Sequence, residues 1–287
     1  LAAACKGPEV PLAFLTFGNY SSTGNLVPMA RVPYLNSLNN LANADGINGS
    51  ARNPYHDGFV IDRIERALQQ QMKARISQAR LSRVERSQSM LYAAQLNSKA
   101  LERVTPFVPK TSPKEQLSRQ ADIALASFKA GVCVSANLNI GTFDSHKDND
   151  IDQMKLLPQL LAGVDYFVRR AEELEIRDKL VFVIQSEMGR TPKYNNNNGK
   201  DHWSVGSVMF MGRGIQGDRV IGATDEKQFL VPIDPKTLST DKEEGVRVRP
   251  EHIHAQLRTL AGIESHEFSK QFPLKVPEQE TLKNLWG

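Results

Sequence analysis

Residues 179–192 read Lys-Leu-Val-Phe-Val-Ile-Gln-Ser-Glu-Met-Gly-Arg-Thr-Pro and join an apolar run to a polar motif. The apolar, β-branched part, residues 179–185, predicts a buried strand of a parallel sheet. Ligands of open α/β sheets bind beyond the carboxyl ends of the strands. We therefore expect Glu187 and Arg190, which follow this strand directly, to belong to a functional site.

Two other apolar runs lie next to carboxylate or imidazole side chains. The run Gly131–Gly141 is followed by Asp144 and His146, and His202 precedes the run Val205–Met211. Carboxylate and imidazole side chains bind zinc, manganese or calcium. Three strand-end loops thus predict a divalent metal site with Asp144, His146, Glu187 and His202 as ligands. Their ligand atoms should then lie within about 8 Å of one another, because metal–ligand bonds are near 2 Å.

Plainer interpretations of these residues stay open. Glu187 could cap a strand end, Arg190 could be a surface residue, and His202 could lie in an ordinary loop. Asp148 and Asp150 could cap the helix that follows them or serve as outer metal ligands, and capping is favoured.

Composition excludes several classes of protein. The chain has 287 residues, of which 40% are hydrophobic and 24% charged, as in an ordinary globular domain. A formal charge of +4 does not indicate nucleic-acid binding. No apolar run of about eighteen residues is present, so no membrane span is expected. Of the two cysteines, Cys133 is predicted to be a core residue, and no disulfide framework is indicated.

The amino-terminal part predicts a strand followed by long loops. Residues 10–17 are apolar, and Ser21, Ser22 and Thr23 come after them in a turn-rich segment. A hydroxyl nucleophile there is conceivable, but no neighbouring residue in the sequence could activate it. A turn is therefore preferred, the nucleophile is left unassigned, and residues 25–56 are expected to be loop.

Residues 59–104 predict a long helical arm, with a break near Gln88 or Asn97. One face is apolar (Val60, Ile61, Ile64, Leu68, Met72 and Ile76), and the other is basic (Arg63, Arg66, Lys73, Arg75, Arg80, Arg83 and Arg86). The basic face lacks the aromatic residues that stack on nucleotides, so a solvated surface is favoured over a nucleic-acid site. Self-association through the arm is an alternative use of the apolar face.

The remaining elements alternate between helices and strands. Helices are expected at 113–129 after an N-cap at Ser112, at 151–176 after a cap at Asp150 or Asp152, and at 250–262. A short strand is expected at 219–223, and His252 and His254 are expected on a helix surface. This alternation predicts an α/β fold whose mostly parallel central sheet carries helices on both faces.

Several motifs together resemble one bacterial family. Phe143–His146, Ser186–Pro192 and Lys200–Trp203 are similar to the motifs of domain of unknown function 1501. The resemblance extends from about residue 11 to about residue 260. It implies membership of the alkaline phosphatase and sulfatase superfamily.

The resemblance carries further implications for organisation and location. It implies a single alkaline phosphatase-like domain over residues 1–287, with 59–104 as an arm or insertion. It also implies an exported, periplasmic or extracellular protein. Family members have an upstream segment with an export signal and the first strand. Superfamily enzymes place a further Asp ligand and the nucleophile there, so this chain alone is expected to be inactive on simple esters.

Two functions are consistent with these observations. The first is a metal-dependent hydrolase of small phosphate or sulfate esters. In it, Arg190 pairs with the anionic group while Lys200 and Asp201 line the mouth of the site. The second is a non-catalytic exported binding or assembly protein that uses the same fold. A bound metal with an open coordination position favours the enzyme.

Overall fold

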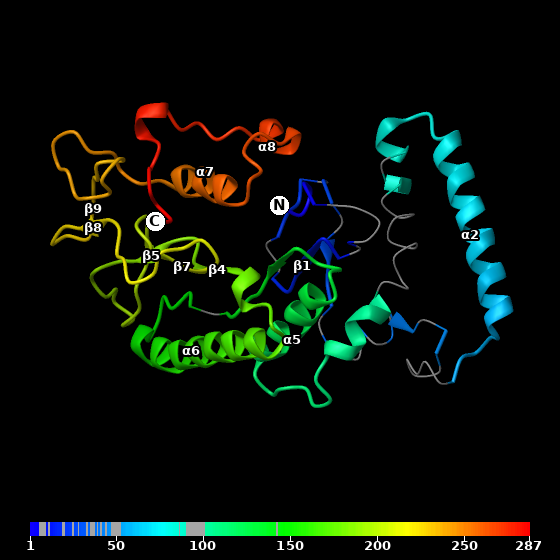
Figure 1. Ribbon diagram of the computed structural model, residues 1–287. Helices are drawn as coiled ribbons and strands as arrows, with labels where there is room; N and C mark the ends of the chain where they lie inside the picture. Colours follow the sequence, from blue (N-terminus) through cyan, green and yellow to red (C-terminus); the bar gives the residue numbers. More distant parts are fainter. Residues whose placement is uncertain are drawn as a thin grey trace. The chain divides into compact units, whose positions relative to one another are not determined.

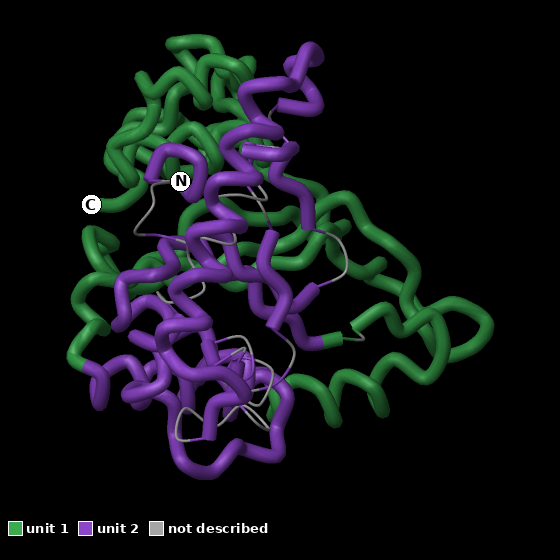
Figure 2. The backbone as a smooth tube through the Cα atoms, turned by 90° about the vertical axis from the view of Figure 1, so that its right-hand side faces the viewer, with its two compact units in different colours: residues 1, 141–159, 175–287 green, residues 2–140, 160–174 purple. Residues whose placement is uncertain are grey.

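The computed structural model describes most of the chain and divides it into two compact units. Described are residues 1–5, 10, 12–18, 21–24, 26–27, 29–32, 34, 38, 40, 42–43, 45–46, 53–85, 87–89, 101–141 and 143–287. Unit 1 contains residues 1, 141–159 and 175–287, and unit 2 contains residues 2–140 and 160–174 (Figure 2).

Unit 2 contains a small parallel sheet. β1 (Phe14–Thr16) lies between β2 (Met29–Ala30) and β3 (Ser135–Asn137), and both neighbours run parallel to it. The strands predicted at 10–17 and 131–141 are thus present in shorter form. Leu15 lies on β1, the central strand, and is fully buried. Serine and asparagine side chains meet at the carboxyl end of β1 and β3, where Asn137 donates to Ser21 Oγ at 2.9 Å.

The core of unit 2 forms between this sheet and α5 (Gln116–Lys129), drawn in Figure 1. Its buried members include Leu15, Val32, Leu38, Val104, Ile123, Ala124, Val132 and Cys133. The prediction that Cys133 is a core residue is confirmed, and burial raises the pKa of its thiol to about 12. The prediction of Ser112 as the N-cap is wrong, since the helix begins three residues later than expected, after Glu115.

The helical arm is shorter than its sequence pattern suggests. α2 (Gly58–Gln78) begins after Asp57, whose side chain accepts from Val60 N–H, and it ends at Ala79, ahead of the predicted break. Gln88 lies in a short helical stretch, Asn97 and Arg86 lie outside the described residues, and η2 (Glu102–Phe107) follows. The apolar face is confirmed only in part, because Met72 is 4% exposed whereas Ile64 and Leu68 are 45% and 43% exposed.

α6 (Asn149–Glu173) contributes its first part to unit 1 and its second part to unit 2. Within unit 2, Tyr166 donates to both carboxylate oxygens of Asp122 on α5 at 3.0 Å, and Arg170 forms an ion pair with Asp122. Burial raises the pKa of Asp122. The predicted cap at Asp150 or Asp152 is wrong, because both residues lie inside the first turn of the helix.

Unit 1 is built on an antiparallel strand pair. β4 (Val181–Gln185) follows η3 (Arg177–Lys179) and pairs with β7 (Val208–Gly212). The predicted strand is confirmed, but its burial and its parallel pairing are wrong. Alternate β4 residues are exposed, with Val181 at 42% and Val183 at 36%. An antiparallel sheet can leave one face solvated even when the strand is apolar throughout, and the sequence does not signal that case.

The remainder of unit 1 consists of short elements around α7 (Pro250–Leu260). These are β8 (Ala223–Thr224), β9 (Leu230–Val231), α8 (Glu267–Gln271) and η4 (Glu278–Glu280). The strand predicted at 219–223 is reduced to its last residue, and the helix predicted at 250–262 is confirmed. No helix in the described ranges has the length and apolar character that crossing a membrane requires.

The position of His252 on α7 differs from the prediction. It was expected on the surface but is 1% exposed, while His254 is exposed as predicted. The Nδ1 atom of His252 accepts from Arg249 N–H at 2.9 Å, and its Nε2 atom lies 3.2 Å from the Glu280 carboxylate. The carboxyl-terminal segment therefore covers this face of the helix.

Candidate metal centre

The motif after β4 contains a short strand that pairs with a second short strand about ten residues later. β5 (Gly189–Arg190) is antiparallel to β6 (His202–Trp203), with Arg190 directly opposite His202. Side chains of directly opposed residues lie on the same face of a strand pair. A Cβ on Gly189 would lie 1.9 Å from the Val205 carbonyl oxygen, so glycine is needed for this close approach. The hairpin therefore places a guanidinium and an imidazole side by side.

The loop between β5 and β6 binds the backbone of the segment that carries Asp144 and His146. Lys200 N–H donates to the Ser145 carbonyl at 3.0 Å, and Asn149 N–H donates to the Asn198 carbonyl at 2.9 Å. Gly199 lies at the closest point, where an added Cβ would be 1.9 Å from the His146 carbonyl group. These bonds hold two segments that are more than forty residues apart in the sequence.

Asn195 connects the parts of this loop. Its Oδ1 accepts from the N–H groups of Asn197 and Gly199 at 2.9 and 3.0 Å. Its Nδ2 donates to the His146 carbonyl at 3.0 Å and to Asp201 Oδ1 at 2.9 Å. An amide side chain has two donors and a carbonyl oxygen with two lone pairs, and all are used here. The sequence predicted only an exposed asparagine-rich loop, so the role of Asn195 was missed.

Behind Asp144 and His146, Ser145 fixes the segment to the first turns of α6. Ser145 is 2% exposed, donates to Asn149 Oδ1 at 2.8 Å and accepts from Gln153 Nε2 at 3.1 Å. Because residues 144 and 146 flank this buried serine, their side chains project to the opposite, exposed side. Ser145 is thus a positioning residue.

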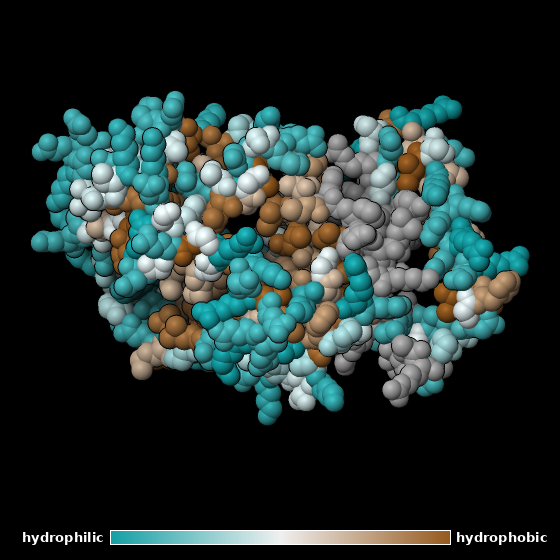
Figure 3. Space-filling model, viewed as in Figure 1, coloured by the Kyte–Doolittle hydropathy of each residue, from teal (hydrophilic) through white to brown (hydrophobic). Residues whose placement is uncertain are grey.

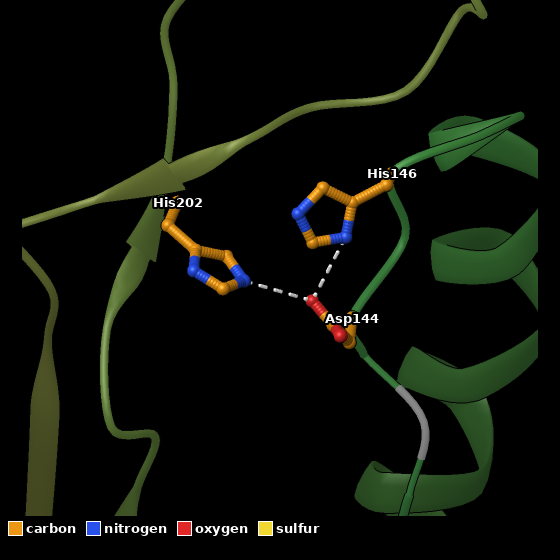
Figure 4. Close-up of side chains that lie close together, drawn as sticks. All are labelled: Asp144, His146 and His202. Carbon is orange, nitrogen blue, oxygen red and sulfur yellow. Dashed lines mark hydrogen bonds and ion pairs between the residues drawn. The ribbon is translucent and has the colours of Figure 1, made fainter.

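Asp144, His146 and His202 converge on one point (Figure 4). The Oδ1 atom of Asp144 lies 3.1 Å from His146 Nδ1 and 3.1 Å from His202 Nε2. One ligand atom from each of the three residues lies within 4.8 Å of the others. Ligand atoms around a tetrahedral zinc ion are about 3.3 Å apart, given bonds near 2 Å. The three side chains therefore have the chemistry and nearly the spacing of a zinc ligand set.

Arg190 is a third partner of the same carboxylate. Its Nη2 donates to Asp144 Oδ1, and its Nη1 donates to the Lys200 carbonyl at 2.9 Å. The hydrogen bonds from Arg190 and His202 lower the pKa of Asp144 to about 2. Asp144 is therefore an anion at any ordinary pH and can serve as a ligand without first losing a proton.

The other predicted site residues lie outside this group. Glu187 is exposed in the connection between β4 and β5 and is not part of the converging set. Lys200 Nζ donates to the Pro192 carbonyl at 3.3 Å and lies 4.9 Å from the centre of the Tyr194 ring. Asp201 is bonded to Asn195. The structure thus brings together three of the four predicted ligands with Arg190, while Lys200 and Asp201 hold the loop.

Asp150 also stabilises the loop. The Tyr194 hydroxyl donates to both of its carboxylate oxygens, at 2.8 and 2.9 Å. Hydrogen bonds from Asn149 and Tyr194 lower the pKa of Asp150. The hydrogen bond between Tyr194 and Asp150 also raises the pKa of Tyr194. Neither Asp148 nor Asp150 belongs to the converging group. The Asp150–Tyr194 contact is a link that residue spacing did not reveal.

The sequence pattern of a family described as "Protein of unknown function (DUF1501)" matches residues 41–273, which include every residue of the candidate centre. The chain belongs to the DUF1501 family. The family resemblance drawn from the motifs is therefore confirmed. No curated protein and no solved structure matches this DUF1501 chain.

Proposed function

We propose that this DUF1501 chain is the metal-binding part of a hydrolase of small phosphate or sulfate esters. The observation that carries the proposal is the convergence of Asp144, His146 and His202 from two segments of unit 1. A loop with several interlocking hydrogen bonds holds the two segments together. Hydrogen bonds of this kind fix the orientation of the ligand side chains, as a metal site requires.

The ligand set favours zinc or manganese over calcium. One carboxylate and two imidazoles are typical of catalytic zinc sites, which keep a further coordination position open for substrate. Calcium takes six to eight oxygen ligands, and imidazole does not suit it. When bound, a divalent ion would polarise the ester oxygen and lower the pKa of a water molecule.

Arg190 is the residue best placed to recognise the ester. Its planar guanidinium can donate two parallel hydrogen bonds to a phosphate or sulfate group. It stands opposite His202 on the hairpin and contacts Asp144, so an anion bound by it would lie beside the ligand set. Asn195 holds the His146 backbone and thereby fixes the orientation of that ligand. Ser145 is buried and fully engaged, which makes it unsuitable as the nucleophile.

The alkaline phosphatase-like fold is part of the same proposal. In that fold a mostly parallel sheet carries helices on both faces, with the site beyond the strand ends. The parallel pairing β2-β1-β3 is consistent with this fold, whereas β4 and β7 pair antiparallel.

The test is ester hydrolysis by the purified protein. Turnover of p-nitrophenyl phosphate or sulfate should require added zinc or manganese and should cease with a chelator. Asp144→Asn keeps the size of the side chain but removes the charge, so we expect a loss of about 100-fold or more. Asp165→Asn is the matched control, because Asp165 is exposed and, among the described residues, pairs with Arg169 on α6 and not with the candidate centre. Turnover that survives both chelation and Asp144→Asn would contradict the proposal.

A second candidate is a non-catalytic binding or assembly role for α2. The observation that favours it is the exposure of Ile64 and Leu68 between basic residues of the arm. Over α2, the visible surface is mostly hydrophilic with small hydrophobic spots (Figure 3). Tight zinc binding at the centre, without turnover of either ester, would favour this role over the hydrolase.

A further inference from the structure

Three side-chain nitrogens lie against a single oxygen at the candidate centre. Asp144 Oδ1 receives Arg190 Nη2 and lies 3.1 Å from each of His146 Nδ1 and His202 Nε2. A ring nitrogen that binds a cation no longer donates to Oδ1, so a bound cation and the Arg190 guanidinium would be two positive charges on this one oxygen. A cation held by the two imidazoles would also contact Oδ1, because Oδ1 is the carboxylate atom that faces both rings (Figure 4).

We propose that Arg190 and the divalent cation compete for Asp144 Oδ1, so that cation binding frees the guanidinium to hold an oxyanion beside the cation. This inference rests on the proposed function, since it assumes that Asp144, His146 and His202 bind a metal. It adds an order of binding, in which the metal enters first and the anionic group of the ester second. Arg190 thereby becomes a sensor of the metal as well as a substrate-binding residue.

The anchoring of Arg190 makes such an exchange feasible. Its backbone is fixed by pairing with His202, and its Nη1 is held by the Lys200 carbonyl at 2.9 Å. Nη2 can leave Asp144 while that anchor stays in place. The side chain of Asp144 is 64% exposed and that of Arg190 20% exposed, so solvent reaches the contact and an incoming anion can do so as well.

Charge repulsion favours the movement of Arg190 away from Asp144 when the cation binds. A guanidinium is always protonated, so it and a divalent cation repel each other across the shared oxygen. An oxyanion placed between them attracts both and removes the conflict. The two ligands should therefore favour each other's binding, and linkage requires that each raises the affinity of the other by the same factor.

The test is calorimetry with zinc and inorganic sulfate on the 287-residue chain. Arg190→Gln removes the competing cation, so we expect zinc to bind about tenfold more tightly. Lys193→Gln removes one exposed positive charge from the same loop, is not among the described ion-pair partners of Asp144, and should change zinc affinity by less than about twofold. Wild-type chain should bind sulfate only when zinc is present, and Arg190→Gln should lose this zinc-dependent binding.

The outcomes separate this inference from the proposed function. No zinc binding by wild type or by any variant would defeat both. Zinc binding that depends on Asp144 but is unchanged or weakened in Arg190→Gln would overturn the exchange and leave the metal site intact. Sulfate binding by zinc-free wild type as tight as by the zinc-loaded chain would also overturn the exchange, and this result does not depend on how the variants fold.

Discussion

Replacing His202 with alanine is expected to weaken zinc binding by more than about 100-fold. Loss of an outer-shell partner alone costs about 10- to 100-fold in metal affinity, and His202 is assigned to the ligand set itself. The remaining pair, Asp144 and His146, comes from one short segment and leaves two ligands, fewer than the usual catalytic zinc site has. Competition with a chromogenic chelator measures the affinity.

His254→Ala is the matched control for this substitution. His254 is exposed on α7 in the same unit, so its replacement removes an imidazole without touching the converging group. Zinc affinity should stay within about twofold of wild type. Equal losses in the two variants would show that zinc binds surface histidines in general, and the assignment of the site would be wrong.

Gly199→Ala is expected to lower the free energy of unfolding by about 3 kcal/mol and to weaken zinc binding at the same time. The new Cβ would lie 1.9 Å from the His146 carbonyl carbon and oxygen and 2.4 Å from Lys147 N. These are backbone atoms, so no rotamer change relieves the clash. Separating the loop from the 145–149 segment would cost about 1 kcal/mol for each lost hydrogen bond, in addition to the strain.

Gly217→Ala provides the control for a glycine substitution in the same unit. Apart from Gly217 and its two chain neighbours, no described heavy atom lies within 4 Å of the Cβ position at Gly217. Urea unfolding should therefore give nearly wild-type stability for Gly217→Ala and a lowered midpoint for Gly199→Ala. Wild-type stability and zinc affinity in Gly199→Ala would mean that the loop does not lie against His146 as described.

The ligands could be predicted from sequence because their signal is local. Asp144, His146 and His202 each stand next to an apolar run, and strand ends are where sites form. Glu187 gave the same signal but lies outside the group. β5 begins only at Gly189, so Arg190, opposite His202, takes the position on the hairpin that faces Asp144.

The supporting residues could not be predicted because their roles depend on distant partners. Asn195 and Gly199 act through the His146 backbone about fifty residues earlier, and neither asparagine nor glycine in a loop signals such a contact. His252 shows the same effect, since it is buried by the segment that contains Glu280. The pairing direction of β4 was also hidden, because its apolar run suits a buried parallel strand as well as an antiparallel one.

The central claim is that Asp144, His146 and His202 hold one divalent ion, and zinc-edge anomalous diffraction tests it most directly. Crystals grown with zinc should show an anomalous peak about 2.0–2.2 Å from one carboxylate oxygen of Asp144 and from one ring nitrogen of each histidine. In the same crystals, the guanidinium of Arg190 should have left Asp144. Zinc peaks at other positions, with none between these three side chains, would contradict the account.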